Sequence, residues 1–85
     1  MKQKIDHELK IWPQYYELVK SDIKPWEIRK NDRNYQIGDI IRFKEFDPKT
    51  NQYTGRNFVR RIMFLFKQDG FGLQKGYCIF NVIKT

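Results

Sequence analysis

The sequence predicts an α+β, mainly β, fold: a small β-barrel of about five strands with one short N-terminal helix. Three observations favour this class. The chain has 85 residues, which suits a single domain over 1–85. Only one segment shows helical spacing of apolar residues, whereas five show strand-like patterns. The segments lack the alternation of strands and helices that parallel βαβ units require, so the sheet should be antiparallel or mixed.

The first strand is expected at residues 5–11. Leu9 and Ile11 are spaced by two, which indicates a strand with one buried face. His7 shares that face. An inward histidine with a hydrogen-bond partner is the favoured interpretation, and a role in a site is the alternative.

The one helix should begin at Pro13 and end near residues 21–22. Proline suits the first turn of a helix, where its missing N–H costs nothing. Tyr15, Leu18 and Val19 follow at helical spacing and should form the buried face. A helix this short must pack on the sheet to be stable.

A second strand is predicted over 24–30. Trp26 and Ile28 share one face, and Glu27 and Arg29 share the other. The apolar pair is expected to face the core. Polar turn residues end this strand at 31–34.

Three further strands are expected at 39–46, 56–66 and 77–83, separated by turn-forming segments at 47–51 and 68–72. Gly55 should open the strand at 56–66, in which Phe64 is placed on the same face as Ile62. Both faces of this strand are apolar, so it should be central in the sheet or lie in a closed barrel. Cys78, in the last strand, is expected to be a core residue.

Composition restricts the possible functions. Lys and Arg number 17 against 10 Asp and Glu, and the net charge of +7 favours polyanionic partners. Aromatic residues make up 16% of the chain, and some could stack on bases. One cysteine excludes an internal disulfide, and a single His with a single Cys argues against a zinc site, so neither a metal nor another cofactor is expected. No apolar segment resembles a membrane span or a signal peptide, which favours a cytoplasmic protein.

Charges are densest between residues 24 and 33. Six of these ten residues are charged: Lys24, Glu27, Arg29, Lys30, Asp32 and Arg33. Glu27 and Arg29 can pair on one strand face, with Lys24 alongside. The segment is either an exposed edge with weak ion pairs or a ligand site in which Arg binds phosphate or a base edge. Spacing alone favours the exposed edge.

The same segment resembles a known family. The run from Lys24 to Arg33, with Gly38-Asp39, Asp47-Pro48 and 69–73, looks like the DUF3850 family, which is frequent in phages. Lys24-x-x-Glu27-x-Arg29 followed by Gly38-Asp39 is also similar to the signature of ASCH domains, which belong to the PUA-like superfamily of small RNA-associated β-barrels. Where ASCH domains usually have Gly two residues before the Lys, this chain has Asp22, which can also adopt a left-handed conformation.

The resemblance implies an RNA- or nucleic-acid-binding domain and shifts the balance toward a ligand site. A membrane partner is not expected, because the one helix is short and carries few charges. The binding residues that the resemblance implies are Lys10, Lys24, Glu27, Arg29, Lys30 and Arg33, with His7, Trp26 and Tyr35 as possible groove-lining residues. Of these, Trp26 is placed in the core by its neighbour Ile28.

Two other functions remain open. Some ASCH proteins are amidohydrolases that act on acylated cytidines, which implies Lys24 and Glu27 as catalytic residues if the chain is an enzyme. That activity is associated with Lys, a Thr three residues on and a distant Glu. Glu27 occupies the Thr position, so the resemblance carries over the Lys alone. A phage accessory protein that binds a host protein is the third possibility.

Overall fold

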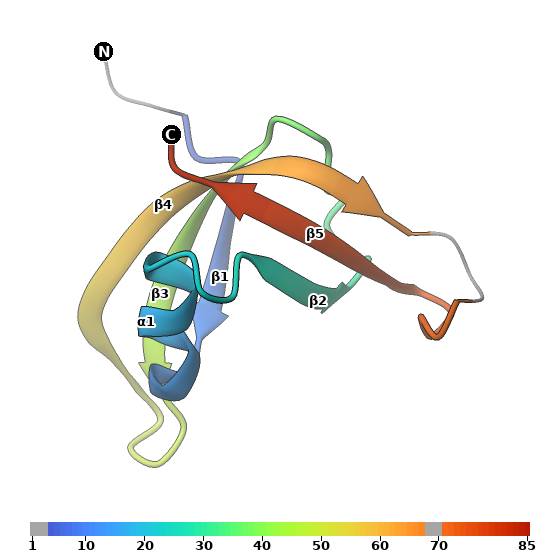
Figure 1. The fold of residues 1–85 in the computed structure, drawn as a ribbon. Coiled ribbons are helices and arrows are strands. Elements are labelled where there is room, and N and C mark those ends of the chain that lie inside the picture. Colours follow the sequence, from blue (N-terminus) through green and yellow to red (C-terminus); the bar gives the residue numbers. More distant parts are fainter. Residues whose placement is uncertain (1–3, 68–70) are drawn as a thin grey trace.

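The computed structural model describes residues 4–67 and 71–85. These residues form a five-stranded sheet and one short helix (Figure 1). The elements in chain order are β1 (His7–Ile11), α1 (Pro13–Lys20), β2 (Trp26–Lys30), β3 (Ile40–Asp47), β4 (Gln52–Phe66) and β5 (Tyr77–Ile83). The predicted mainly β fold with five strands and an N-terminal helix is confirmed. Within the described residues, no helix is both long and apolar enough to span a bilayer.

The strands lie in the order β1-β3-β4-β5-β2. β1 runs parallel to β3, and the other neighbouring pairs are antiparallel, which confirms the mixed sheet. The long strand β4 is central, as its two apolar faces predict. β1 and β2 are the two edges, and no ladder joins them in the described part of the chain. The sheet is therefore open, and a closed barrel is not confirmed.

Two arginine side chains connect the edges instead. Arg29 Nη2 donates a hydrogen bond to the carbonyl of Lys10 at 2.8 Å, and Arg33 Nη1 donates to the carbonyl of Glu8 at 3.2 Å. Guanidinium groups carry several N–H donors, so they can satisfy carbonyls of β1 that would otherwise stay unpaired at a sheet edge. The sheet is thus curved so strongly that the length of an arginine side chain spans the gap between its two edges.

The hydrophobic core lies between α1 and the concave side of the sheet (Figure 1). Tyr16 of α1 meets Phe58 of β4 edge-on, with ring centroids 5.0 Å apart. Ile62 and Phe80 are fully buried, as is Cys78. The expected core position of Cys78 is therefore confirmed. The complete cluster is Leu9, Ile11, Tyr16, Val19, Tyr35, Ile41, Phe43, Phe58, Ile62, Cys78, Phe80 and Val82.

Helix α1 starts at Pro13, as predicted, and ends one residue before the expected boundary. Asp22, after the helix, has φ 65°, the left-handed conformation expected for it. The buried face differs from the prediction by one residue: Tyr16 and Val19 are buried, whereas Tyr15 is half-exposed. The aromatic pair Tyr16–Phe58 fixes this rotation of the helix, and Tyr15 turns toward β2.

The inward face of β2 is the opposite of the predicted one. Trp26 and Ile28 are about half-exposed, whereas Glu27 is only 6% exposed. The alternation is correct, but the assignment of Trp26 to the core is wrong. The polar face can be buried because cations on both sides of Glu27 neutralise its carboxylate.

Strand β4 starts earlier than predicted and contains an irregularity. It begins at Gln52, and Gly55, with φ 94°, bends it rather than opening it. The register with β5 shifts between Ile62 and Phe64. Because this bulge adds one residue, Phe64 points outward and Leu65 packs on the core. The expectation that Phe64 shares the face of Ile62 is therefore wrong. Of the loop predicted at 68–72, residues 68–70 lie outside the described residues.

Candidate functional site

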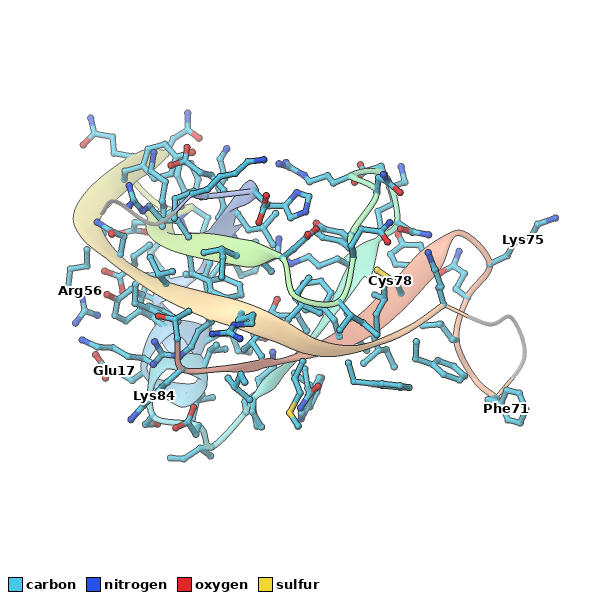
Figure 2. All side chains as sticks on the ribbon, turned by 90° about the horizontal axis from the view of Figure 1, so that it is seen from above. Glu17, Arg56, Phe71, Lys75, Cys78 and Lys84 are labelled. Atoms are coloured by element: carbon cyan, nitrogen blue, oxygen red, sulfur yellow. The ribbon has the colours of Figure 1, made fainter. Side chains whose placement is uncertain are left out.

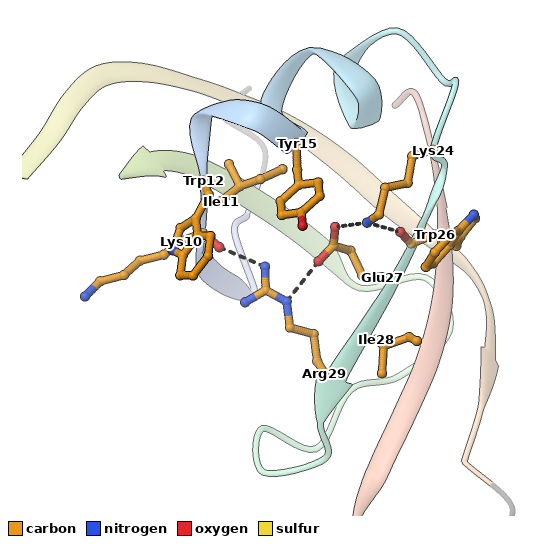
Figure 3. Close-up of a pocket in the computed structure, with 9 residues that line it drawn as sticks. All are labelled: Lys10, Ile11, Trp12, Tyr15, Lys24, Trp26, Glu27, Ile28 and Arg29. Carbon is orange, nitrogen blue, oxygen red and sulfur yellow. Dashed lines mark hydrogen bonds and ion pairs between the residues drawn. The ribbon is translucent and has the colours of Figure 1, made fainter. Parts of the chain in front are cut away.

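The opening between the two sheet edges contains a pocket of about 620 Å³ (Figure 3). The end of β1, the start of α1 and most of β2 line it, so three segments of the N-terminal third of the chain build it. The lining residues are Lys10, Ile11, Trp12, Tyr15, Lys24, Trp26, Glu27, Ile28 and Arg29.

A three-residue ion-pair network forms the polar side of the pocket. Glu27 Oε1 accepts a hydrogen bond from Lys24 Nζ at 3.0 Å, and Oε2 accepts one from Arg29 Nε at 3.0 Å. Lys24 Nζ also donates to the carbonyl of Trp26 at 2.9 Å. The carboxylate is nearly buried, whereas both cations keep about a quarter or less of their side-chain surface exposed. The network is thus partly open to a ligand.

Arg29 links this network to the other edge of the sheet. Its Nε binds Glu27 while its Nη2 binds the carbonyl of Lys10. Only a guanidinium can hold both acceptors in one rigid plane, so a lysine could not replace it. The network therefore fixes both the pocket and the spacing between β1 and β2.

Aromatic side chains form the other walls. Trp12, Tyr15 and Trp26 are 47%, 42% and 45% exposed, and Figure 3 shows them around the ion pairs. Lys24 Nζ lies 4.5 Å from the centroid of a Trp26 ring and 5.5 Å from that of Tyr15. Rings that gather around a concave site without being buried offer flat surfaces to a planar ligand.

Five of the predicted site residues line the pocket: Lys10, Lys24, Trp26, Glu27 and Arg29. Lys10 contributes mainly its backbone, because its ammonium lies over Phe46, 4.3 Å from the ring centroid, and Figure 3 shows it pointing away from Glu27. Of the charged side chains between residues 24 and 33, the structure thus brings Lys24, Glu27 and Arg29 together in the pocket.

The other predicted residues lie elsewhere. His7 Nε2 is 2.7 Å from Asp39 Oδ2, and its ring packs on Tyr35, which confirms the inward histidine with a partner. Tyr35 is buried in the core, so its ring is not available for stacking. Burial raises the pKa of Tyr35, while nearby Arg29 and Arg33 oppose that rise. Arg33 bridges to β1, and Lys30 is exposed at the end of β2.

Sequence reasoning missed four lining residues: Ile11, Trp12, Tyr15 and Ile28. Trp12 had a usable signal. It stands directly before Pro13, at the N-cap of α1, where a large aromatic side chain gives no cap hydrogen bond. For Tyr15 the signal was obscured, because its helical spacing with Leu18 also fits a core position.

The described residues, 4–67 and 71–85, contain no group of three His, Cys, Asp or Glu side chains placed to hold a metal ion. Cys78 is buried, and this burial raises the pKa of its thiol. A buried neutral thiol is a poor nucleophile. The ionic and aromatic groups of the pocket therefore define the candidate site.

Comparison with known proteins gives two findings. The family model described as "Domain of unknown function (DUF3850)" matches residues 6–82. The chain is also similar to the "Uncharacterized 12.9 kDa protein in GpA 3'region" of Escherichia phage P2, with 39% identity over 56 residues, which cover 66% of this chain and 50% of the phage protein. The chain thus spans about half the length of the curated relative it matches.

Proposed function

The chain belongs to the DUF3850 family, and we propose that it is a nucleic-acid-binding module of the ASCH-like, PUA-like kind that takes an unpaired base into its pocket. One observation carries the proposal. Three half-exposed aromatic side chains surround an ion-paired polar wall in a chain of net charge +7. Single-stranded nucleic acids are bound by this combination of stacking surfaces and positive charge.

The aromatic walls supply the stacking. A base inserted into the pocket lies against Trp12, Tyr15 or Trp26, and stacking on an aromatic side chain is worth about 1–3 kcal/mol per base. The pocket volume of about 620 Å³ falls within the range of small-molecule sites. The volume is therefore large enough for a base with its sugar.

The polar wall supplies hydrogen bonds. In the described residues, Lys24 Nζ has two acceptors for its three protons, and Arg29 uses its Nε and Nη2. The remaining N–H groups favour a base edge that carries a carbonyl acceptor. The second lone pairs of the Glu27 carboxylate can accept from an amino group on the same base.

We assign the contacts with phosphate groups to cations around the pocket. Lys24 and Arg29 are already paired with Glu27, so their charges are partly neutralised. Lys10 and Lys30 lie near the ends of β1 and β2, and Arg33 follows β2. We assign these three residues to the phosphates. Such contacts release counterions, so binding should weaken steeply with salt.

The ASCH-like placement rests on the motif and its position. Lys24, Glu27 and Arg29 come together as one network in the pocket. Asp39, from the second part of the motif, holds His7 and the backbone N–H of Gln36. Both parts of the motif therefore contact strands of one curved sheet, which is compatible with a barrel-related fold.

A matched pair of variants tests the function. Tyr15→Ala removes a pocket wall, and we expect it to weaken binding of a short single-stranded RNA or DNA about tenfold. Ile37→Ala removes an exposed apolar side chain that does not line the pocket. It should leave the affinity within about twofold. Fluorescence anisotropy at low salt measures both.

Equal affinities for the wild type and Tyr15→Ala, with both folded, would contradict the proposal. Binding that is independent of salt would do the same, because phosphate contacts require a salt dependence.

A hydrolase is the second candidate, and one observation favours it: Lys24 and Glu27 lie 3.0 Å apart inside the same pocket. Held in place by that carboxylate, Lys24 is the candidate base or nucleophile for a modified nucleoside. Incubation with N4-acetylcytidine tests this candidate. Release of acetate that Lys24→Ala abolishes in a folded protein would support it, and no release from the wild type would reject it.

A further inference from the structure

A second surface, separate from the core, is formed by outward-facing apolar side chains of β2, β5 and the C-terminal half of β4. Phe64 is 60% exposed, and Phe71, just beyond β4, is the most exposed large apolar residue described. Figure 2 shows Phe71 at the end of the molecule away from Arg56 and Glu17. We call this surface the outer apolar face. Its members are Trp26, Ile28, Phe64, Phe66, Phe71 and Ile79.

The strand register joins the two sides of the outer apolar face through Ile79. Ile79 of β5 pairs with Ile28 on one side and Phe66 on the other, whereas Trp26 and Phe64 flank the polar Asn81. Phe66 and Phe71 lie with their ring centroids 6.1 Å apart. Phe64 and Phe66 lie two positions apart in β4, which corresponds to about 7 Å along the strand.

The β-bulge in β4 turns Phe64 and Phe66 outward. If the strand alternated regularly, without the register shift between Ile62 and Phe64, Phe64 would point into the core. Contiguous apolar surface of this kind on a soluble domain marks an interaction site.

The charges on this side indicate the partner. Lys30 and Arg61 occupy outward positions of β2 and β4, next to Tyr77 and Ile83 in register. The described outward positions of β2, β5 and β4 from Arg61 onward include no carboxylate. A second copy of this chain would bring a like-charged rim, at +7 per chain, against this one. A polyanion is instead attracted.

The outer apolar face also joins the pocket. Trp26 and Ile28 belong to the outward side of β2 and at the same time line the pocket, because β2 is an edge strand. A strand of nucleic acid that leaves the pocket over Trp26 therefore reaches Phe64 by crossing only β5.

We propose that the outer apolar face is a stacking platform for single-stranded nucleic acid, on which bases that neighbour the one in the pocket rest against Phe64 and Phe66. The proposal extends the proposed function and rests on it for the path of the strand. Only unpaired bases expose their flat faces, so duplexes of the same sequence should not use the platform.

Phe64 offers a sharp test. We expect Phe64→Ala and Phe64→Leu each to weaken binding of a ten-nucleotide single strand about five- to hundredfold, since leucine keeps the apolar surface but cannot stack. Both should leave the affinity for a mononucleotide unchanged. Tyr15→Ala, in the pocket, should weaken both ligands. The side chain of Phe64 is largely exposed, so both variants should fold.

Unchanged ten-nucleotide affinity in Phe64→Ala would overturn the platform while leaving the pocket intact. Full retention of affinity in Phe64→Leu would assign the face to a protein contact and overturn the platform. So would a wild-type dimer in sedimentation that Phe64→Ala dissociates without changing nucleic-acid affinity. The wild type could also fail to bind the mononucleotide while both Phe64 variants lose ten-nucleotide binding. That result would support the platform and reject the pocket.

Discussion

Glu27 shows how one residue can be charged, buried and stable. Its two carboxylate oxygens each accept a hydrogen bond, from Lys24 and from Arg29, and Arg29 continues to the carbonyl of Lys10. Removal of a single partner from such a network leaves the others desolvated and unpaired. The same three residues therefore maintain the pocket and hold the two sheet edges together.

Glu27→Gln tests this dual role. The substitution keeps the shape but removes the charge, so the cations lose their counterion. We expect the free energy of unfolding to fall by about 1–3 kcal/mol in urea denaturation. Glu8→Gln is the control, because Glu8 is exposed and its carboxylate lies 4.0 Å from Arg42. The control should change stability by less than about 0.5 kcal/mol. A Glu27→Gln effect no larger than the control would mean that the network is dispensable.

Glu45 gives a pH-dependent prediction at the other end of the molecule. Hydrogen bonds from Arg56, and from Thr54, lower the pKa of Glu45 from its usual 4.5, although its burial acts against them. A folded-state pKa below the unfolded value stabilises the protein above about pH 4.5, and this stabilisation is lost as the pH falls through the folded-state pKa.

The melting temperature measures this effect. Wild type should be more stable than Glu45→Gln at pH 7, and the difference should shrink steadily as the pH is lowered from 5 to 3. A difference that stays constant over this range would show that Glu45 is not held in its charged form by Arg56.

At the level of elements, the sequence identified every helix and strand that the structure describes, but not which way each of them faces. Period-two spacing correctly paired Trp26 with Ile28, yet hydrophobicity alone placed them in the core. The actual orientation depends on Arg29 reaching across to β1, a contact between residues 19 apart in the chain. Likewise, the outward turn of Phe64 depends on a bulge opposite β5, for which the local sequence carries no clear signal.

The core assignment yields its own prediction. Ile62 of β4 and Phe80 of β5 are fully buried, and either alanine variant should lower the free energy of unfolding by about 2–5 kcal/mol. Ile37→Ala is the matched control, because Ile37 is mostly exposed. Its effect should stay below about 0.5 kcal/mol. Chemical denaturation compares the three, and a core variant as stable as the control would refute the assigned strand faces.

At the level of the whole molecule, the candidate site lies at the break in the sheet. An open sheet whose edges are joined by arginine side chains leaves room between them, and the pocket occupies that room. The charged half of the site could be predicted, because Lys24, Glu27 and Arg29 are close together in the sequence. The aromatic half could not, because the walls combine the start of α1 with an edge strand whose orientation was unknown.

Both tryptophans of the chain, Trp12 and Trp26, line this pocket. Their indole N–H signals are therefore direct NMR reporters of the site. The decisive measurement is a titration of labelled protein with a short single-stranded RNA at 50 and 200 mM salt. We predict that both indole signals shift and that the affinity falls about twentyfold between the two salt concentrations, as three phosphate contacts require. Indole signals that stay fixed at low salt, with or without binding elsewhere on the protein, would contradict a base-binding pocket.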